Sequence, residues 1–360
     1  MKRRDSRRSC GRSRWPPVAE RSRVEWLWWG TGVGARTTRL LLSPLSALFA
    51  VVVRMRNSLY DSRLLPVRSP RLRSLSVGNL TVGGTGKTPI ASWLATQLQS
   101  RGAHPAVVLR GYGDDEPLVH ARLTPEIPIV VNANRYEAIE RAAAAGADVV
   151  VLDDGFQHRG VARTVDVVLI SADFPDGPKR MLPTGPFREP STALRRASLV
   201  IVTRKAASLE RAQAIAAQVD RVAPGMQTAI VHLSLGAVHV EGRPSAPLSS
   251  IAGRRVLAIA GVGNGAAFGE QLSQGGAIVR MRAYPDHHPF TASDGQSLAR
   301  DLGVDEIALC TLKDAVKLLP LWPREAPAIG YVSQAVIVEE RGEAIDAILD
   351  LVIHLGLRQL

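Results

Sequence analysis

Short apolar runs and amphipathic stretches alternate along most of this sequence. Residues 148–152 form an almost continuous apolar run, which is typical of a central parallel strand. Similar strand-like runs occur at 105–110, 128–132, 165–170 and 198–203. Between them the apolar residues have helical spacing, at 89–100, 135–145 and 207–219. This alternation predicts a parallel α/β sheet with helices on both faces.

A second alternating series begins near residue 255. It follows a stretch rich in Gly, Pro and Ser at residues 236–252, which we interpret as a domain boundary. Strands are predicted around 255–260, 277–281, 307–310 and 335–338. Helices are predicted near 265–274, 291–302 and 342–354. The sequence therefore predicts a second, smaller α/β unit on the C-terminal side of the boundary.

An apolar segment near the N-terminus has the pattern of an amphipathic helix. The 14 residues between Arg39 and Arg54 carry no charge, whereas a bilayer-spanning helix needs about 20 apolar residues. One face of the helix would hold Leu41, Leu45, Leu48, Phe49 and Val52, and the other Ser43, Ala47, Ala50, Arg54 and Asn57. An apolar stripe with arginines at both ends indicates a helix lying in a membrane interface. The alternative is an ordinary amphipathic helix docked on the body of the protein.

Composition and charge narrow the functional classes. In 360 residues, 46% are hydrophobic and 22% charged, which excludes a disordered, fibrous or polytopic membrane protein. Cys10 and Cys310 are too few for a disulfide framework or a cysteine zinc site, and they indicate a reducing compartment. The net charge of +12 is concentrated in the first 75 residues, which hold 17 Lys and Arg against four Asp and Glu. Such a segment favours an anionic surface. We expect acidic lipid headgroups and no nucleic acid, because the arginines lack regularly interleaved aromatic residues.

A glycine-rich segment lies between a predicted strand at 74–77 and the helix at 89–100. It reads GNLTVGGTGKTP over residues 78–89. Glycines let backbone N–H groups converge on phosphate oxygens, and a helix N-terminus adds positive potential. Lys87 is expected to reach the β- and γ-phosphates of a nucleotide, and the Thr88 hydroxyl to ligate Mg²⁺. The alternative is a glycine-rich turn with an incidental lysine. The predicted phosphate-binding residues are Thr81, which replaces the usual first glycine, Val82, Gly83, Gly84, Thr85, Gly86, Lys87 and Thr88.

Two carboxylates follow the buried strand at 148–152. Asp153 and Asp154 stand directly before Gly155 and Phe156. The carboxyl ends of parallel strands face the crevice in which ligands bind, and carboxylates there hold Mg²⁺ directly or through water. The alternative is an Asp-Asp pair that only begins a turn. Beside the phosphate loop, the sequence favours a metal site, with either carboxylate as the direct ligand.

These motifs, taken with others in the same order, resemble the tetraacyldisaccharide 4′-kinase family of lipid A biosynthesis. The matching segments are 44–46, 78–89, 110–113, 115–118, 153–158, 182–190, 261–264, 285–289 and 313–317. The resemblance implies a P-loop NTPase-like core, a smaller C-terminal α/β domain and an N-terminal amphipathic helix at the membrane. It implies ATP and Mg²⁺ as cofactors, and transfer of phosphate to the 4′-hydroxyl of a tetraacylated disaccharide 1-phosphate, giving lipid IVA. The protein would then be peripheral, at the cytoplasmic face of the inner membrane.

The resemblance also implies roles for individual residues. Asp115 would be the base that accepts the sugar hydroxyl proton, assisted by His287. His288 is adjacent, and only the match to the family's Asp-His pair prefers His287. Arg188 would lie near the phosphates and Glu189 near the metal. A loop of variable length usually precedes the Asp-Glu-Pro motif in the family, but here Gly113 runs directly into Asp114.

We therefore expect a disordered basic tail at 1–38, a membrane-interfacial helix at 39–62, a P-loop kinase core at 63–238 and a C-terminal α/β domain at 239–360. No obligate protein partner is evident from the sequence. One rival is a P-loop GTPase or ATPase of another class, but a guanine-reading Asn/Thr-Lys-x-Asp motif is not evident. The other rival is a basic nucleic-acid-binding protein, which would explain the tail but not the pairing of loop and carboxylates.

Overall fold

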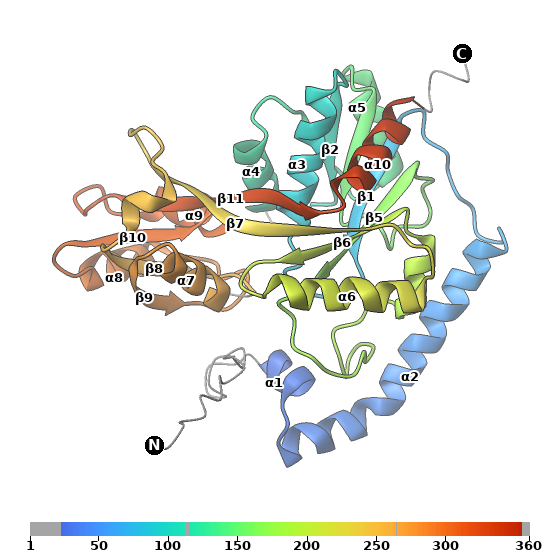
Figure 1. Cartoon of the computed structure of the whole chain (residues 1–360), viewed down its shortest axis with the longest axis horizontal. Helices are drawn as coiled ribbons and strands as arrows, with labels where there is room; N and C mark the ends of the chain where they lie inside the picture. The colour runs from blue at the N-terminus through green and yellow to red at the C-terminus, as the bar shows by residue number, and fades with distance from the viewer. Residues whose placement is uncertain (1–22, 112–114, 264, 355–360) are drawn as a thin grey trace, which may run out of the picture.

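The computed structural model describes residues 23–111, 115–263 and 265–354. Within these ranges the strands form one 11-stranded sheet with the order β3-β2-β4-β1-β5-β6-β7-β11-β10-β8-β9 (Figure 1). Residues 1–22 of the predicted basic tail, and the junction between Gly113 and Asp114, lie outside the described residues. The mostly parallel α/β sheet and the N-terminal helix confirm the predicted fold class.

The first half of the sheet holds six parallel strands, paired side by side. They are β1 (Arg73–Asn79), β2 (Pro105–Leu109), β3 (Ile129–Val131), β4 (Val149–Asp153), β5 (Val165–Ser171) and β6 (Leu199–Arg204). The helices are α3 (Lys87–Ser100), α4 (Asp115–Leu123), α5 (Arg135–Ala144) and α6 (Leu209–Val222), with a 3-10 turn at Ser191–Arg196. Successive side chains of a strand point to opposite faces, so these apolar strands give the sheet two apolar faces. α3 covers one face, and α5 and α6 cover the other. Of these strands and α-helices, only α4 was not predicted from the sequence; the 3-10 turn was not predicted either.

The second half repeats the alternation on the other side of two long strands. Its strands are β8 (Arg255–Ala260), β9 (Ile278–Ala283) and β10 (Glu306–Thr311), and its helices are α7 (Gly265–Gln274), α8 (Ala292–Asp301) and α9 (Leu312–Leu318). The two long strands are β7 (Thr228–Val240) and β11 (Ile329–Glu340), which pair antiparallel. β7 also pairs with β6, and β11 with β10, so the sheet is continuous across both halves. β7 runs through residues 236–240, and the predicted division at 238/239 stays a prediction.

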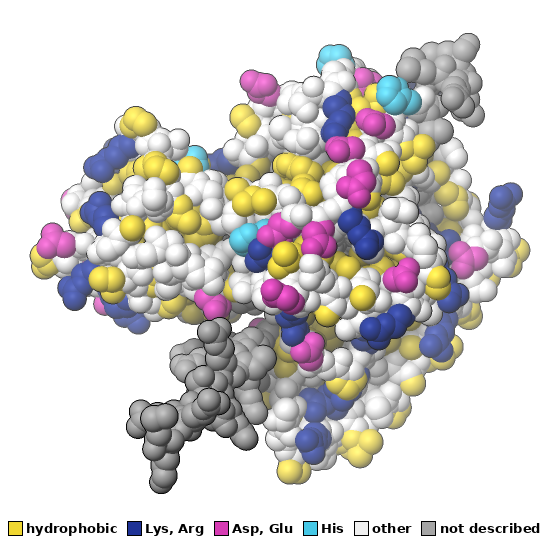
Figure 2. All heavy atoms as spheres, viewed as in Figure 1, with side chains coloured by type: hydrophobic (Ala, Val, Ile, Leu, Met, Phe, Trp, Pro, Cys, Tyr) yellow, Lys and Arg dark blue, Asp and Glu magenta, His cyan; other side chains and the backbone are white. Residues whose placement is uncertain are grey.

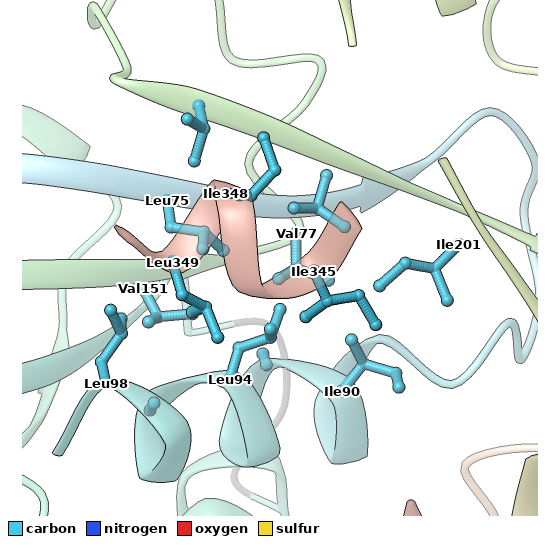
Figure 3. Close-up of a cluster of buried hydrophobic side chains, with 14 of the residues drawn as sticks. Leu75, Val77, Ile90, Leu94, Leu98, Val151, Ile201, Ile345, Ile348 and Leu349 are labelled. Atoms are coloured by element: carbon cyan, nitrogen blue, oxygen red, sulfur yellow. The ribbon is translucent and has the colours of Figure 1, made fainter. Parts of the chain in front are cut away.

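The main core joins segments from opposite ends of the chain. Leu75 and Val77 of β1 face Ile90 and Leu94 of α3, and all four are fully buried (Figure 3). The last helix, α10 (Gly342–His354), inserts between them through buried side chains that Figure 3 labels: Ile345, Ile348 and Leu349. Burying each such side chain stabilises the fold by about 1.5–3 kcal/mol. α10 follows the second half in sequence, yet it completes the core of the first half.

Among the described residues, two helices precede the sheet, α1 (Arg23–Trp29) and α2 (Val33–Asp61). Residues 23–29 and 33–38, which were predicted to be disordered, are therefore helical. α2 begins six residues before the predicted start at 39 and runs along the outside of the body (Figure 1). Polar contacts attach it along its length. The Ser46 hydroxyl donates to the Met181 carbonyl at 2.9 Å, and the Asn57 amide donates to Glu189 at 2.9 Å. Near the C-terminal end, Val53 is buried against the body.

The apolar stripe of α2 faces away from the body. Leu41 is 74% exposed and Leu48 60% exposed, and Leu45 and Val52 are exposed beside them. Figure 2 shows hydrophobic side chains along the outer edge that α2 forms, with arginine and lysine side chains among them. The helix therefore docks by a face between the two predicted ones, through Ser46, Phe49, Val53 and Asn57, and most of the predicted apolar face stays uncovered. Ser43, Ala47 and Arg54 of the predicted polar face are also exposed. By length and composition, α2 is the one helix among the described residues that could cross a membrane.

Candidate active site

The candidate site lies at the carboxyl ends of two neighbouring strands. β1 and β4 are parallel, and their register places Val77 opposite Asp153. The glycine-rich loop follows β1 and leads into α3, which begins at Lys87, two residues before the predicted start. The N-terminus of α3, with its unpaired N–H groups, therefore meets the carboxylates that end β4.

The conformation of the loop explains its glycines. Gly83 has φ +117° and Gly86 has φ +86°, both in the left-handed region that favours glycine. A Cβ on Gly86 would also lie 2.3 Å from Cδ1 of Leu233. Inside the loop, the Asn79 side-chain amide donates to the Thr85 hydroxyl at 2.8 Å. The loop is therefore a braced structure rather than a chance glycine-rich turn.

A cavity of about 460 Å³ opens over the loop. That volume is within the usual range for small-molecule sites. Val262, Asp286, His287 and Lys313 of the second half also line it. The predicted nucleotide-binding residues all line this cavity: Thr81, Val82, Gly83, Gly84, Thr85, Gly86, Lys87, Thr88 and Arg188.

Positive side chains surround Asp154 at the base of the cavity. Arg188 donates to both oxygens of Asp154, at 3.0 and 2.8 Å, and Lys87 Nζ lies 3.6 Å from Oδ1. Burial alone would raise the pKa of Asp154, but the Arg188 hydrogen bonds and the Lys87 charge outweigh it and lower this pKa to about 2. Arg188 and Lys87 both also donate to the Asn79 side-chain oxygen. The structure thus brings two cations and an ionised carboxylate together.

Asp153 has a different environment from its neighbour. It is buried, and its Oδ2 accepts hydrogen bonds from Thr88 at 3.3 Å and from His120 Nε2 at 3.0 Å. Its Oδ1 is also buried, and it lacks a hydrogen-bond partner among the described residues. A buried carboxylate oxygen without a donor fits a cation, and a hydroxyl beside it is a further oxygen ligand of the kind Mg²⁺ prefers. Groups of three or more His, Cys, Asp or Glu arranged as a metal site were not found within the described ranges.

The structure also brings together the pair predicted for proton transfer. Asp115 begins α4 and is buried, and its Oδ2 lies 3.8 Å from His287 Nδ1 and 3.9 Å from Lys317 Nζ. His287 lines the cavity and adopts a left-handed backbone, with φ +60°. His288 turns elsewhere: its Nε2 lies 3.4 Å from Asp294, and its ring packs against aromatic side chains.

Glu189 has contacts that were not expected for a metal ligand. It is 1% exposed, and both of its oxygens accept hydrogen bonds from Arg196, at 2.9 and 3.2 Å. Asn57 of α2 donates to the same carboxylate, and Arg56 lies 4.0 Å away. These contacts connect the α2 helix to the body, so the metal role of Glu189 stays a prediction that the geometry does not favour.

Several residues of the site were not predicted. His120, which lay outside the recognised motifs, contacts Asp153. Asn79, which lay inside the phosphate-loop motif, accepts hydrogen bonds from both Lys87 and Arg188. Glu116 lines the cavity, and burial, with the charge of Asp153, raises its pKa. Lys205 also lines it, and burial lowers the pKa of that amine. Sequence spacing could not show these contacts because each joins separate elements.

A glycine-rich phosphate loop, a helix N-terminus, a lysine and strand-end carboxylates over one cavity define a P-loop nucleotide-binding protein. A sequence profile of the tetraacyldisaccharide-1-P 4′-kinase family matches residues 38–115 and 113–353. The chain belongs to this family.

Individual relatives agree with the profile. The tetraacyldisaccharide 4′-kinase of Syntrophus aciditrophicus is 37% identical over 353 residues, covering 86% of this chain and 92% of the relative. That of Anaeromyxobacter dehalogenans strain 2CP-1 is 37% identical over 329 residues, covering 83% and 86%. The crystal structure of an "apo" form of LpxK from Aquifex aeolicus in complex with ATP is similar, with a TM-score of 0.68 at 26% identity, covering 87% of this chain and 99% of that one. The predicted family resemblance and kinase class are confirmed.

Proposed function

We propose that this protein transfers the γ-phosphate of ATP to the 4′-hydroxyl of a tetraacyldisaccharide 1-phosphate, giving lipid IVA. One observation carries the proposal: the cavity over the phosphate loop is also lined by His287, which lies 3.8 Å from Asp115. A phosphate donor on the loop and a proton acceptor for an alcohol would therefore meet in one site. The relatives that carry the same activity in their names cover most of the chain.

The nucleotide phosphates would replace part of the ion network around Asp154. Loop N–H groups at 81–88, other than those of Val82 and Thr85, which already donate to backbone carbonyls, would bind the phosphate oxygens, and Lys87 and Arg188 would bring positive charge to them. Phosphoryl transfer needs positioning and charge neutralisation more than covalent chemistry. A lysine and an arginine already held within contact distance of one carboxylate supply both.

Thr88 and Asp153 are the residues that would hold Mg²⁺. The hydroxyl of Thr88 is 3.3 Å from Asp153 Oδ2, and Asp153 Oδ1 is the buried oxygen without a donor among the described residues. When bound, Mg²⁺ neutralises charge on the β- and γ-phosphate oxygens. Asp154 is engaged by Arg188 and Lys87, so we assign the direct contact to Asp153 and a charge-balancing role to Asp154.

Asp115 would be the general base. As the sugar oxygen bonds to the γ-phosphorus and the bond to the ADP oxygen breaks, the hydroxyl proton passes to the Asp115 carboxylate. His287 Nδ1 is close enough to orient that carboxylate, and Lys317 contributes positive charge 3.9 Å away. His288 is held by Asp294 and aromatic contacts, which favours His287 as the partner.

The exposed apolar face of α2 would place the protein at a membrane surface. A neighbouring face of the helix is attached to the body at Ser46, Val53 and Asn57, so the stripe can lie in the interface while the body stays in water. Arg36 and Arg54 flank the stripe and would meet anionic headgroups. We assign this surface to the cytoplasmic leaflet of the inner membrane, where ATP is available to the site.

The proposal is tested by incubating the full chain with ATP, Mg²⁺ and the disaccharide 1-phosphate in detergent. Mass spectrometry should detect a lipid one phosphate heavier, formed only when both ATP and Mg²⁺ are present. GTP in place of ATP serves as the matched control for the rival GTPase class. Nucleotide hydrolysis without phosphorylated lipid would contradict the proposal and favour a P-loop hydrolase.

A further inference from the structure

A chain of three polar side chains lies buried beside the phosphate loop. His120 of α4 is 0% exposed; its Nδ1 lies 2.8 Å from the Ser92 hydroxyl of α3, and its Nε2 lies 3.0 Å from Asp153 Oδ2 at the end of β4. Ser92 and Asp153 are themselves buried. The three residues come from three elements and meet only in the fold.

The donor and acceptor capacity of each group fixes the direction of the two hydrogen bonds that join Ser92, His120 and Asp153. A carboxylate oxygen only accepts, so His120 Nε2 carries the hydrogen that Asp153 Oδ2 receives. In the neutral ring Nδ1 is then an acceptor, and the Ser92 hydroxyl donates to it. Every member has a partner, and the arrangement needs no additional buried charge.

These hydrogen bonds set the orientation of the Asp153 carboxylate. Its Oδ2 is occupied by His120 and Thr88, and Arg135 Nη2 donates to its backbone oxygen at 2.7 Å. The carboxylate is therefore held through Oδ2 and the residue through its backbone oxygen, with Oδ1 left for another ligand. Side chains that donate to a metal-binding group commonly set its orientation and the affinity of the metal.

His120 also connects this carboxylate to the helix of the proposed base. α4 begins at Asp115, and His120 lies little more than one turn further along the same helix. An apolar side chain of similar size could fill the same space beside Val119, but it could not join α4 to Asp153.

We propose that His120 is a positioning residue, oriented by Ser92, which holds Asp153 so that Oδ1 faces the divalent cation of the bound nucleotide. The inference rests on the proposed nucleotide and metal site but not on the identity of the phosphate acceptor. Loss of the hydrogen bond to Asp153 should weaken the cation affinity more than it lowers kcat at saturating Mg²⁺.

Two polar substitutions separate the hydrogen bond from the fold. His120→Gln keeps a donor at about the position of Nε2, whereas His120→Asn reaches only the position of Nδ1, towards Ser92. The readout is Mn²⁺ binding to the full chain with a non-hydrolysable ATP analogue, followed by the electron paramagnetic resonance signal of free Mn²⁺. His120→Asn should weaken Mn²⁺ binding by about 10–100-fold and His120→Gln by less than about threefold. His104→Asn, at an exposed histidine, is the matched control and should change nothing.

The outcomes distinguish this inference from the proposed function. Equal Mn²⁺ affinity of the Gln and Asn variants would overturn the positioning role, even if lipid phosphorylation were intact. Failure of the wild-type chain to bind Mn²⁺ with the nucleotide analogue would also overturn it. If the predicted difference appears but no lipid is phosphorylated, the positioning role stands and the proposed acceptor is wrong. If His120→Asn does not fold, Ser92→Ala replaces it, and wild-type Mn²⁺ affinity in that variant would refute the role.

Discussion

Replacing Lys87 by methionine removes a positive charge from the phosphate loop and keeps most of the side-chain volume. Lys87 Nζ lies 3.6 Å from Asp154 Oδ1 and 3.4 Å from Asn79 Oδ1. It is beside the N-terminus of α3, where phosphate oxygens would bind. Two unit charges about 4 Å apart at an effective dielectric constant near 20 interact by about 4 kcal/mol. Since about 1.36 kcal/mol corresponds to a factor of ten in rate, kcat should fall on the order of 10³-fold. Arg188 does not replace the lost charge, because its own charge already belongs to the wild-type site beside Asp154.

The same geometry predicts little effect on stability. The Lys87–Asp154 pair is partly exposed, and such a pair is worth less than about 1 kcal/mol. The melting temperature of Lys87→Met should therefore stay close to that of the wild type while lipid phosphorylation, measured by mass spectrometry, is nearly lost. Lys179→Ala, at an exposed lysine, is the control for both measurements. Phosphorylation within tenfold of the wild type in Lys87→Met would show that this loop is not the ATP site.

Three further predictions concern the base, the ion network and the membrane face. Asp115→Asn should lower kcat by about 10²–10⁴-fold with little change in ATP binding, His287→Ala should lower it less, and the double variant should be less than additive. The folded pKa of Asp154 is about 2 against an ordinary 3.8, so its ionised form stabilises the fold above about pH 4 and this contribution is lost as the pH falls towards 2. The melting-temperature difference between wild type and Asp154→Asn should therefore be largest at neutral pH, shrink below about pH 4 and vanish only below about pH 2. Replacing Leu41 and Leu48 together by Asp should abolish flotation of the chain with anionic vesicles.

The predictions for the base and the membrane face each have a control variant, and the prediction for the ion network has an outcome that would contradict it. For the base, His288→Ala should leave the kcat pH profile in place, and a crippled His288→Ala beside a normal His287→Ala would reverse the assignment. For the ion network, a melting-temperature difference independent of pH would show that Asp154 acts through shape rather than charge. For the membrane face, Ile278→Asp changes an apolar side chain that is 61% exposed far along the chain, and flotation should survive it. Flotation of the double Leu variant at wild-type levels would remove α2 from the contact.

The sequence predicted most of the elements because their signals are local. The apolar runs of β4 and β5, and the glycine spacing before Lys87, depend only on neighbouring residues. The order of motifs then placed Asp115 and His287 in one site, and the two side chains do lie 3.8 Å apart. The missed helix α4 has only nine residues, with a proline in its first turn, so its periodicity is too short to detect.

What the sequence could not show depends on contacts between distant segments. β7 was not predicted, and its end from Gly236 fell in a stretch of Gly, Pro and Ser that suggested a boundary, whereas its pairing with β11 extends the strand to Val240. His120 contacts residues 28 and 33 positions away, a separation that leaves no pattern in one sequence. The outward orientation of the apolar stripe on α2 was also invisible, because periodicity shows that a face is apolar but not what covers it.

The place of α10 in the core has a consequence for how the protein is made. A ribosome releases the chain from its N-terminal end, and the residues before 342 must emerge before α10 can form. Until then, Leu75, Leu94 and their neighbours lack the side chains of Ile345, Ile348 and Leu349 that cover them. The nucleotide-binding half therefore cannot complete its core until α10 has been made, although its own strands and helices are complete some 120 residues earlier. A premature stop codon near residue 340 would leave every residue of the candidate site in place and still produce a protein with an open core.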